Sequence, residues 1–78
     1  MSSAQAEATR LLAEALQIEQ SEISDATAIG ATERWDSLAH MRLMLALEEL
    51  LGKQIETDDM LSIERHGDVV TYLENNLS

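Results

Sequence analysis

The stretch WDSLAHMRLMLALEELLG, residues 35–52, decides how this chain folds. Asp36 and Ser37 both favour the N-cap of a helix, because their side chains can accept a hydrogen bond from a free backbone N–H. The run 38–51 consists almost entirely of strong helix formers, and Gly52 is a typical residue after a helix end. The sequence therefore predicts a helix over 38–51 that begins beside a serine.

This predicted helix carries apolar residues on two sides. Steps of 100° per residue group one set on the side that we expect to face the core: Leu43, Leu47 and Leu50, with Ala39, Ala46, Met44 and Leu51 beside them. A second stripe of large apolar residues lies on the other side: Leu38, Met41 and Leu45, interleaved with Arg42, Glu48 and Glu49. Apolar residues rimmed by charge are typical of a protein-docking face, although a short third helix could cover part of this stripe.

A first helix is predicted over residues 3–17, capped by Ser2 or Ser3. Its apolar positions recur at helical spacing: Ala4, Ala8, Leu11, Leu12, Ala15 and Leu16. Residues 18–35 have no sustained period and keep isolated apolar anchors at Ile23 and Ile29, so we expect a long loop there. Loops of this length in small domains tend to be functional.

Two shorter helices are predicted in the last third of the chain. Thr57 can cap a helix of about two turns that buries Met60, Leu61 and Ile63. A last helix begins near Gly67 and buries a stripe: Val69, Val70, Leu73 and Leu77. No segment has the alternating pattern of a strand, so we expect a single all-α domain over residues 1–78.

Composition restricts the partners of the chain. Its 78 residues include 15 acidic and 5 basic side chains, for a formal charge of −10, which repels nucleic acid and anionic lipid and attracts basic protein surfaces. Cysteine is absent, which excludes disulfides, a thiolate metal site and a cysteine nucleophile. No run is long enough to span a bilayer and no secretory signal is evident, so we expect a cytoplasmic monomer without stable membrane insertion.

Ser37 stands where the long loop meets the start of the second helix. A hydroxyl at this place is expected to be exposed. It would lie beside the backbone N–H groups of the first helical turn, which have no partner within the helix, and at the positive end of the helix dipole. A phosphate ester would be stabilised there.

The sequence resembles the acyl carrier protein family over nearly its whole length. The resemblance rests on Asp36-Ser37-Leu38, on the run LMLALEELLG from Leu43 to Gly52, on Ile55 and on the acidic pair Asp58 and Asp59. It implies a four-helix bundle with three main helices, a short third helix and a long loop between helices one and two. It also implies that the chain is not an enzyme but a carrier whose partners perform the chemistry.

What the resemblance implies for function is specific. A phosphopantetheinyl transferase, using coenzyme A and magnesium, would attach 4′-phosphopantetheine to Ser37, beside Trp35, Asp36 and Leu38. The thiol of this arm would hold acyl intermediates as thioesters and present them to enzymes of fatty acid, lipid or specialised-metabolite synthesis that carry basic patches. The second helix would be the main recognition element, with a docking set of Leu38, Met41, Arg42, Leu45, Glu48 and Glu49. Arg42, the segment 33–35 and His66 depart from fatty-acid-synthase carriers, which favours a specialised pathway.

Several alternatives stay open on the sequence alone. The chain could be a peptidyl or aminoacyl carrier, or an unmodified acidic adaptor. A hydrolase using Asp36, Ser37 and His40 is disfavoured because no oxyanion hole or orienting acid is evident. Trp35 either staples the loop to the helix start or contacts the arm, and His40 is expected to be solvated or to face a partner. His40 and His66 are too far apart in sequence to predict a metal site, and none is expected.

Overall fold

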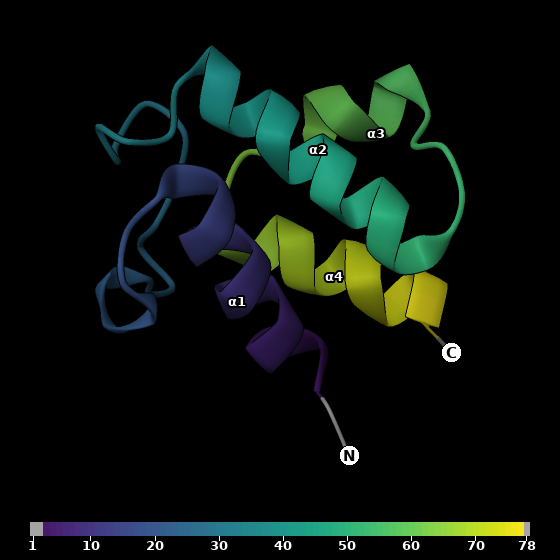
Figure 1. Ribbon diagram of the computed structural model, residues 1–78, viewed down its shortest axis with the longest axis horizontal. Coiled ribbons are helices and arrows are strands. Elements are labelled where there is room, and N and C mark those ends of the chain that lie inside the picture. The colour runs from purple at the N-terminus through teal and green to yellow at the C-terminus, as the bar shows by residue number, and fades with distance from the viewer. Residues whose placement is uncertain (1–2, 78) are drawn as a thin grey trace.

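Four α-helices make up most of residues 3–77, the part of the chain that the computed structural model describes (Figure 1). They are α1 (Ala4–Leu16), α2 (Ser37–Leu51), α3 (Thr57–Ser62) and α4 (His66–Leu77), with a 3-10 turn, η1 (Gln20–Glu22), in the loop after α1. No strand occurs among these residues, only isolated bridges. The predicted all-α bundle, with a short third helix and a long first loop, is confirmed.

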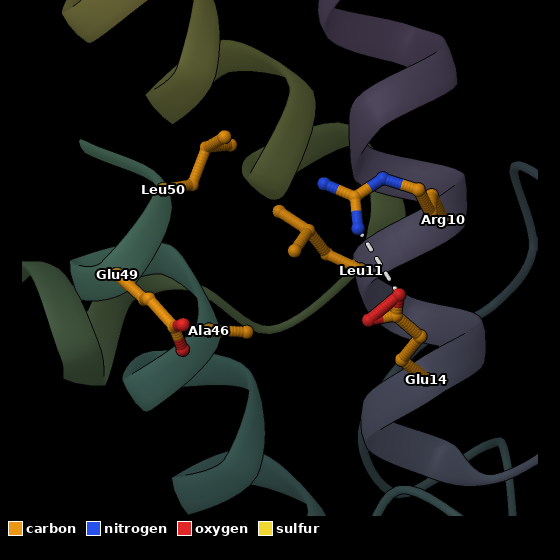
Figure 2. A pocket seen from close by; sticks show the side chains of 6 residues that line it. All are labelled: Arg10, Leu11, Glu14, Ala46, Glu49 and Leu50. Carbon is orange, nitrogen blue, oxygen red and sulfur yellow. Dashed lines mark hydrogen bonds and ion pairs between the residues drawn. The ribbon is translucent and has the colours of Figure 1, made fainter.

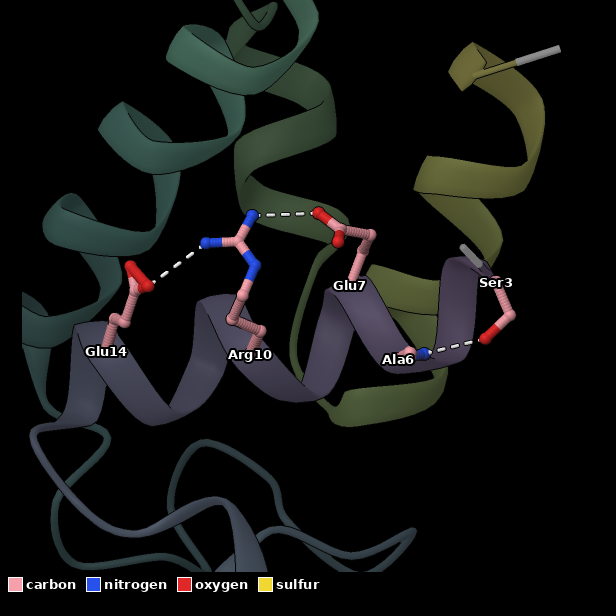
Figure 3. Close-up of polar contacts among 5 residues, drawn as sticks. All are labelled: Ser3, Ala6, Glu7, Arg10 and Glu14. Carbon is pink, nitrogen blue, oxygen red and sulfur yellow. Dashed lines mark hydrogen bonds and ion pairs between the residues drawn. The ribbon is translucent and has the colours of Figure 1, made fainter. Parts of the chain in front are cut away.

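Helix α1 packs against both α2 and α4 (Figure 1). Its N-cap is Ser3, whose Oγ accepts a hydrogen bond of 3.0 Å from the Ala6 N–H (Figure 3). Ser2, the other predicted cap, lies outside the described residues. On the side of α1 that borders α2, Arg10 is held between Glu7 at 2.8 Å and Glu14 at 3.0 Å (Figure 3). The hydrogen bond that Arg10 donates to Glu7 is the main cause that raises the pKa of Arg10.

The core is formed where α1, α2 and α4 meet. Its buried side chains come from every long helix and from the segments between them: Ala8, Leu11, Leu12, Ala15, Leu16, Trp35, Ala39, Leu43, Met44, Leu47, Ile55, Ile63, Val69 and Leu73. The predicted stripes of α1 and α4 are thus largely confirmed, while the side chain of Leu77 lies outside the described part of the chain. The prediction for Leu50 was wrong, because this residue is 37% exposed. It sits on the rim of an open groove between α1 and α2, beside Leu11 and Ala46 (Figure 2).

The long loop is fixed to the start of α4 by backbone hydrogen bonds. The N–H of His66 donates to the Thr27 carbonyl at 3.0 Å, and the N–H of Ile29 donates to the Glu64 carbonyl at 2.8 Å. Ile23 packs against the core as expected, but Ile29 is 39% exposed. The loop is therefore attached by its backbone and not by both predicted apolar anchors.

Helix α3 packs against the core less closely than the longer helices do, since none of its residues is buried. Glu56, not Thr57, occupies its N-cap position. Met60 packs partly against the core and Ile63 just beyond the helix is buried, but Leu61 is 72% exposed and its predicted burial was wrong. A helix of two turns presents only one side to the bundle, and Leu61 lies on the other.

Within residues 3–77 the helices are too short, or too polar, for any of them to pass through a bilayer.

Candidate functional site

The candidate site is the first turn of α2. Asp36 is the N-cap, and its Oδ1 accepts a hydrogen bond of 2.8 Å from the Ala39 N–H. The carbonyl of Asp36 accepts the first helical bond, from the His40 N–H at 2.9 Å. Ser37 is therefore the first helical residue rather than the cap, and it is exposed. The cap frees the Ser37 hydroxyl from any role in starting the helix.

The surroundings of Ser37 fit a phosphate ester. Within residues 3–77, neither the Ser37 hydroxyl nor the N–H groups of Ser37 and Leu38 have an intramolecular hydrogen-bond partner. These N–H groups belong to the positive end of the dipole of a helix with several turns, where an anion is stabilised. Ser37 would carry the covalent link, and the two N–H groups could donate to phosphate oxygens.

Trp35 lies on the other side of the cap, with only 2% of its surface exposed. Its indole N–H donates to His40 Nδ1 at 3.0 Å, and the two rings stack with centroids 6.0 Å apart. Of the two interpretations of Trp35, this burial favours a staple that holds the end of the loop on the start of α2. An indole this deeply buried has little surface left to contact an arm on Ser37.

His40 is half-buried, so the expectation of a solvated or partner-facing side chain was wrong. Its Nδ1 faces Trp35, and its Nε2 lies 2.9 Å from the Met60 carbonyl of α3. Both ring nitrogens are thus occupied by partners other than Ser37, and the Asp36 carboxylate is used by the helix cap. The structure does not assemble Asp36, Ser37 and His40 into a hydrolytic group.

The predicted docking set divides into two groups in the structure. Leu38, Met41 and Leu45, which we call the α2 stripe, are about 60% exposed: 58%, 63% and 63%. Helix α3 therefore does not cover them, and Glu49 is exposed as well. By contrast, Arg42 and Glu48 are half-buried.

Arg42 and Glu48 each make a contact with another part of the fold. Arg42 Nη1 donates to the Ala15 carbonyl near the end of α1, at 3.4 Å. Glu48 Oε2 accepts a hydrogen bond of 3.1 Å from the Ile55 N–H in the α2–α3 connection. Sequence reasoning missed both contacts because they join residues on different elements. These two side chains have structural roles besides any contact with a partner.

No group of three potential metal ligands is formed by the side chains that the structure describes. His66 begins α4 and is 3% exposed, with its Nε2 lying 3.1 Å from Thr9 Oγ1. The two histidines thus serve different packing contacts, one at the start of α2 and one between α1 and α4.

A comparison with known protein families matches most of the chain. A family model described as "Phosphopantetheine attachment site" matches residues 7–73. The match spans all four helices except the ends of α1 and α4, and it includes the first turn of α2 with Ser37.

Proposed function

We propose that this chain, which belongs to the phosphopantetheine attachment site family, is an acyl carrier protein whose arm is attached to Ser37. Members of the family carry covalently bound 4′-phosphopantetheine, which supplies the thiol that this cysteine-free chain lacks. The observation that carries the assignment is an exposed serine hydroxyl at the start of α2, free of intramolecular bonds among the described residues and next to unpaired N–H groups.

In this proposal the protein presents its cargo, and partner enzymes perform the chemistry. Asp36 caps α2 through the Ala39 N–H and so keeps Ser37 at a fixed, accessible position. A phosphopantetheinyl transferase would load Ser37, and acyl-transferring enzymes would then dock on the α2 stripe. The apolar stripe would provide contact area, while Glu49 and the other surface carboxylates would attract basic patches.

The first prediction concerns Ser37. Incubation with coenzyme A, magnesium and a broad-specificity phosphopantetheinyl transferase should add one phosphopantetheine to the wild type and none to Ser37→Ala. Ser21→Ala is the matched control, because Ser21 is also an exposed serine in a helical turn, η1, and its substitution should not affect loading. Intact-mass spectrometry measures the result.

The same experiment separates the carrier from an acidic adaptor. An unmodified wild type, or loading that persists in Ser37→Ala, would contradict the carrier proposal and favour the adaptor. The mass of the group bound to the arm in protein isolated from producing cells would distinguish an acyl cargo from an aminoacyl or peptidyl cargo.

A further inference from the structure

One side-chain hydrogen bond spans the proposed attachment residue. Trp35 and His40 are joined by the indole N–H to Nδ1 bond of 3.0 Å, and Ser37 lies between them in the chain. The backbone is fixed on both sides: the Trp35 N–H donates to the Thr32 carbonyl at 3.0 Å, and the His40 N–H to the Asp36 carbonyl at 2.9 Å. The segment that carries Ser37 is thus closed into a ring by side chains as well as by the helix.

The chemistry of the two partners selects one tautomer of the neutral His40 ring. An indole nitrogen can only donate, so Nδ1 of His40 must accept. The hydrogen of the neutral ring is then on Nε2, which donates to the Met60 carbonyl at 2.9 Å. The hydrogen bonds run in one direction, from Trp35 through His40 to Met60, and they connect the end of the long loop, the first turn of α2 and α3.

We infer that His40 is a positioning residue, which holds the turn bearing Ser37 in the conformation that the phosphopantetheinyl transferase binds. The inference rests on the proposed function. Helix ends fray, and Ser37 is the first residue of α2. Without the bond from Trp35, the turn would occupy the conformation that the transferase binds only part of the time. The apparent affinity for the transferase would then fall in proportion to the population of that conformation.

Two substitutions of His40 separate its two hydrogen bonds. The Asn amide places an oxygen near the position of Nδ1, so His40→Asn can still accept from Trp35 but does not reach Met60. The Gln amide places its nitrogen near the position of Nε2, so His40→Gln can donate to Met60 but does not accept from Trp35. Trp35→Phe keeps an aromatic ring in the core and removes the indole donor.

The experiment measures KM and kcat for loading of each variant by the transferase. His40→Gln and Trp35→Phe should raise KM for the carrier by roughly three- to tenfold, the range that corresponds to one lost hydrogen bond, with kcat unchanged. His40→Asn should rescue most of this loss. The control is His66→Gln, which alters the other histidine and its contact with Thr9, and should lower stability without raising KM.

Circular dichroism establishes that each variant is folded at the assay temperature. In the His40 variants, fluorescence of Trp35, the single tryptophan, also shows that this side chain stays buried. Unchanged KM in both His40→Gln and Trp35→Phe would overturn the inference. An equal rise in KM for Asn and Gln would also overturn it, because the bond to Trp35 would then not be the cause. A wild type that is never loaded would instead refute the proposed function.

Discussion

Arg42 shows how one side chain can belong both to a surface and to the fold. It lies next to the exposed α2 stripe, where a positive charge could select among partner enzymes. It also donates to the Ala15 carbonyl, at the end of α1 where the helix dipole is negative. Its effect on partner choice can therefore be measured only if its effect on stability is measured as well.

The prediction at this position compares two substitutions. Arg42→Glu should lower the free energy of unfolding by about 1 kcal/mol, because it removes a hydrogen bond and places a carboxylate near the negative end of α1. Arg42→Gln should cost about half as much, because it removes the charge without reversing it. Urea unfolding followed by circular dichroism measures both. Equal stability of the two variants would mean that the α1 dipole does not act on residue 42.

The helix ends are where local backbone geometry has the clearest consequence for stability. Gly52 ends α2 with φ of 68°, in the left-handed region, and its N–H donates to the Glu48 carbonyl at 2.8 Å. Gly67 lies in the first turn of α4 without a positive φ. At both positions an added Cβ would meet no atom within 4 Å, so only the backbone preference distinguishes them.

Alanine should therefore have opposite effects at these two glycines. Gly52→Ala should destabilise the protein by about 1 kcal/mol, because a Cβ is strained in the left-handed region. Gly67→Ala should stabilise it by roughly 0.4 to 1 kcal/mol, because alanine loses less backbone entropy in a helix. Thermal and urea unfolding of the two variants test this contrast, and a change of the same sign in both would contradict it.

The helices could be predicted from local sequence, but the contacts between them could not. The helical periodicity of α1, α2 and α4 and the stop at Gly52 are local signals, and the structure forms these three helices and ends α2 at Gly52. The exposure of a side chain depends on which other element packs against that face of its helix, and local sequence does not reveal this. For this reason Leu50 and Leu61 were wrongly predicted to lie in the core.

The same limit applies to the candidate site. The position of Ser37 beside an N-cap follows from three adjacent residues and could be predicted. The contact of His40 with Met60 joins residues twenty positions apart, and that of Arg42 with Ala15 joins residues twenty-seven apart. Nothing local indicates such contacts. A tryptophan buried just before a helix, with a histidine on its first turn, is the signal that could have indicated the link between Trp35 and His40.

At the scale of the whole molecule, charge opposes packing. A formal charge of −10 lies on a body with principal extents of 30, 29 and 17 Å. Within the described range 3–77, three carboxylates are paired with arginines through contacts of 4 Å or less: Glu7, Glu14 and Asp68. The large excess of acidic over basic residues means that most carboxylates repel one another, and this repulsion is relieved when the chain expands on unfolding.

Screening should therefore stabilise the folded state. Raising ionic strength from about 0.01 M to about 0.15 M shortens the Debye length from roughly 30 Å to 8 Å. The first value is close to the longest extent of the molecule, and the second is well below it. We expect the melting temperature to rise by about 5 °C, equivalent to about 1 kcal/mol for a chain of this length. Sodium chloride and magnesium chloride at equal ionic strength should raise the melting temperature alike if both act by screening. The double variant Glu33→Gln, Glu64→Gln, at two exposed positions, carries two fewer negative charges and should gain less from salt. Circular dichroism melts of both proteins in both salts measure these differences. A flat or falling melting temperature would show that the carboxylates do not destabilise the fold, and a much larger effect of magnesium would show that the ion binds rather than screens.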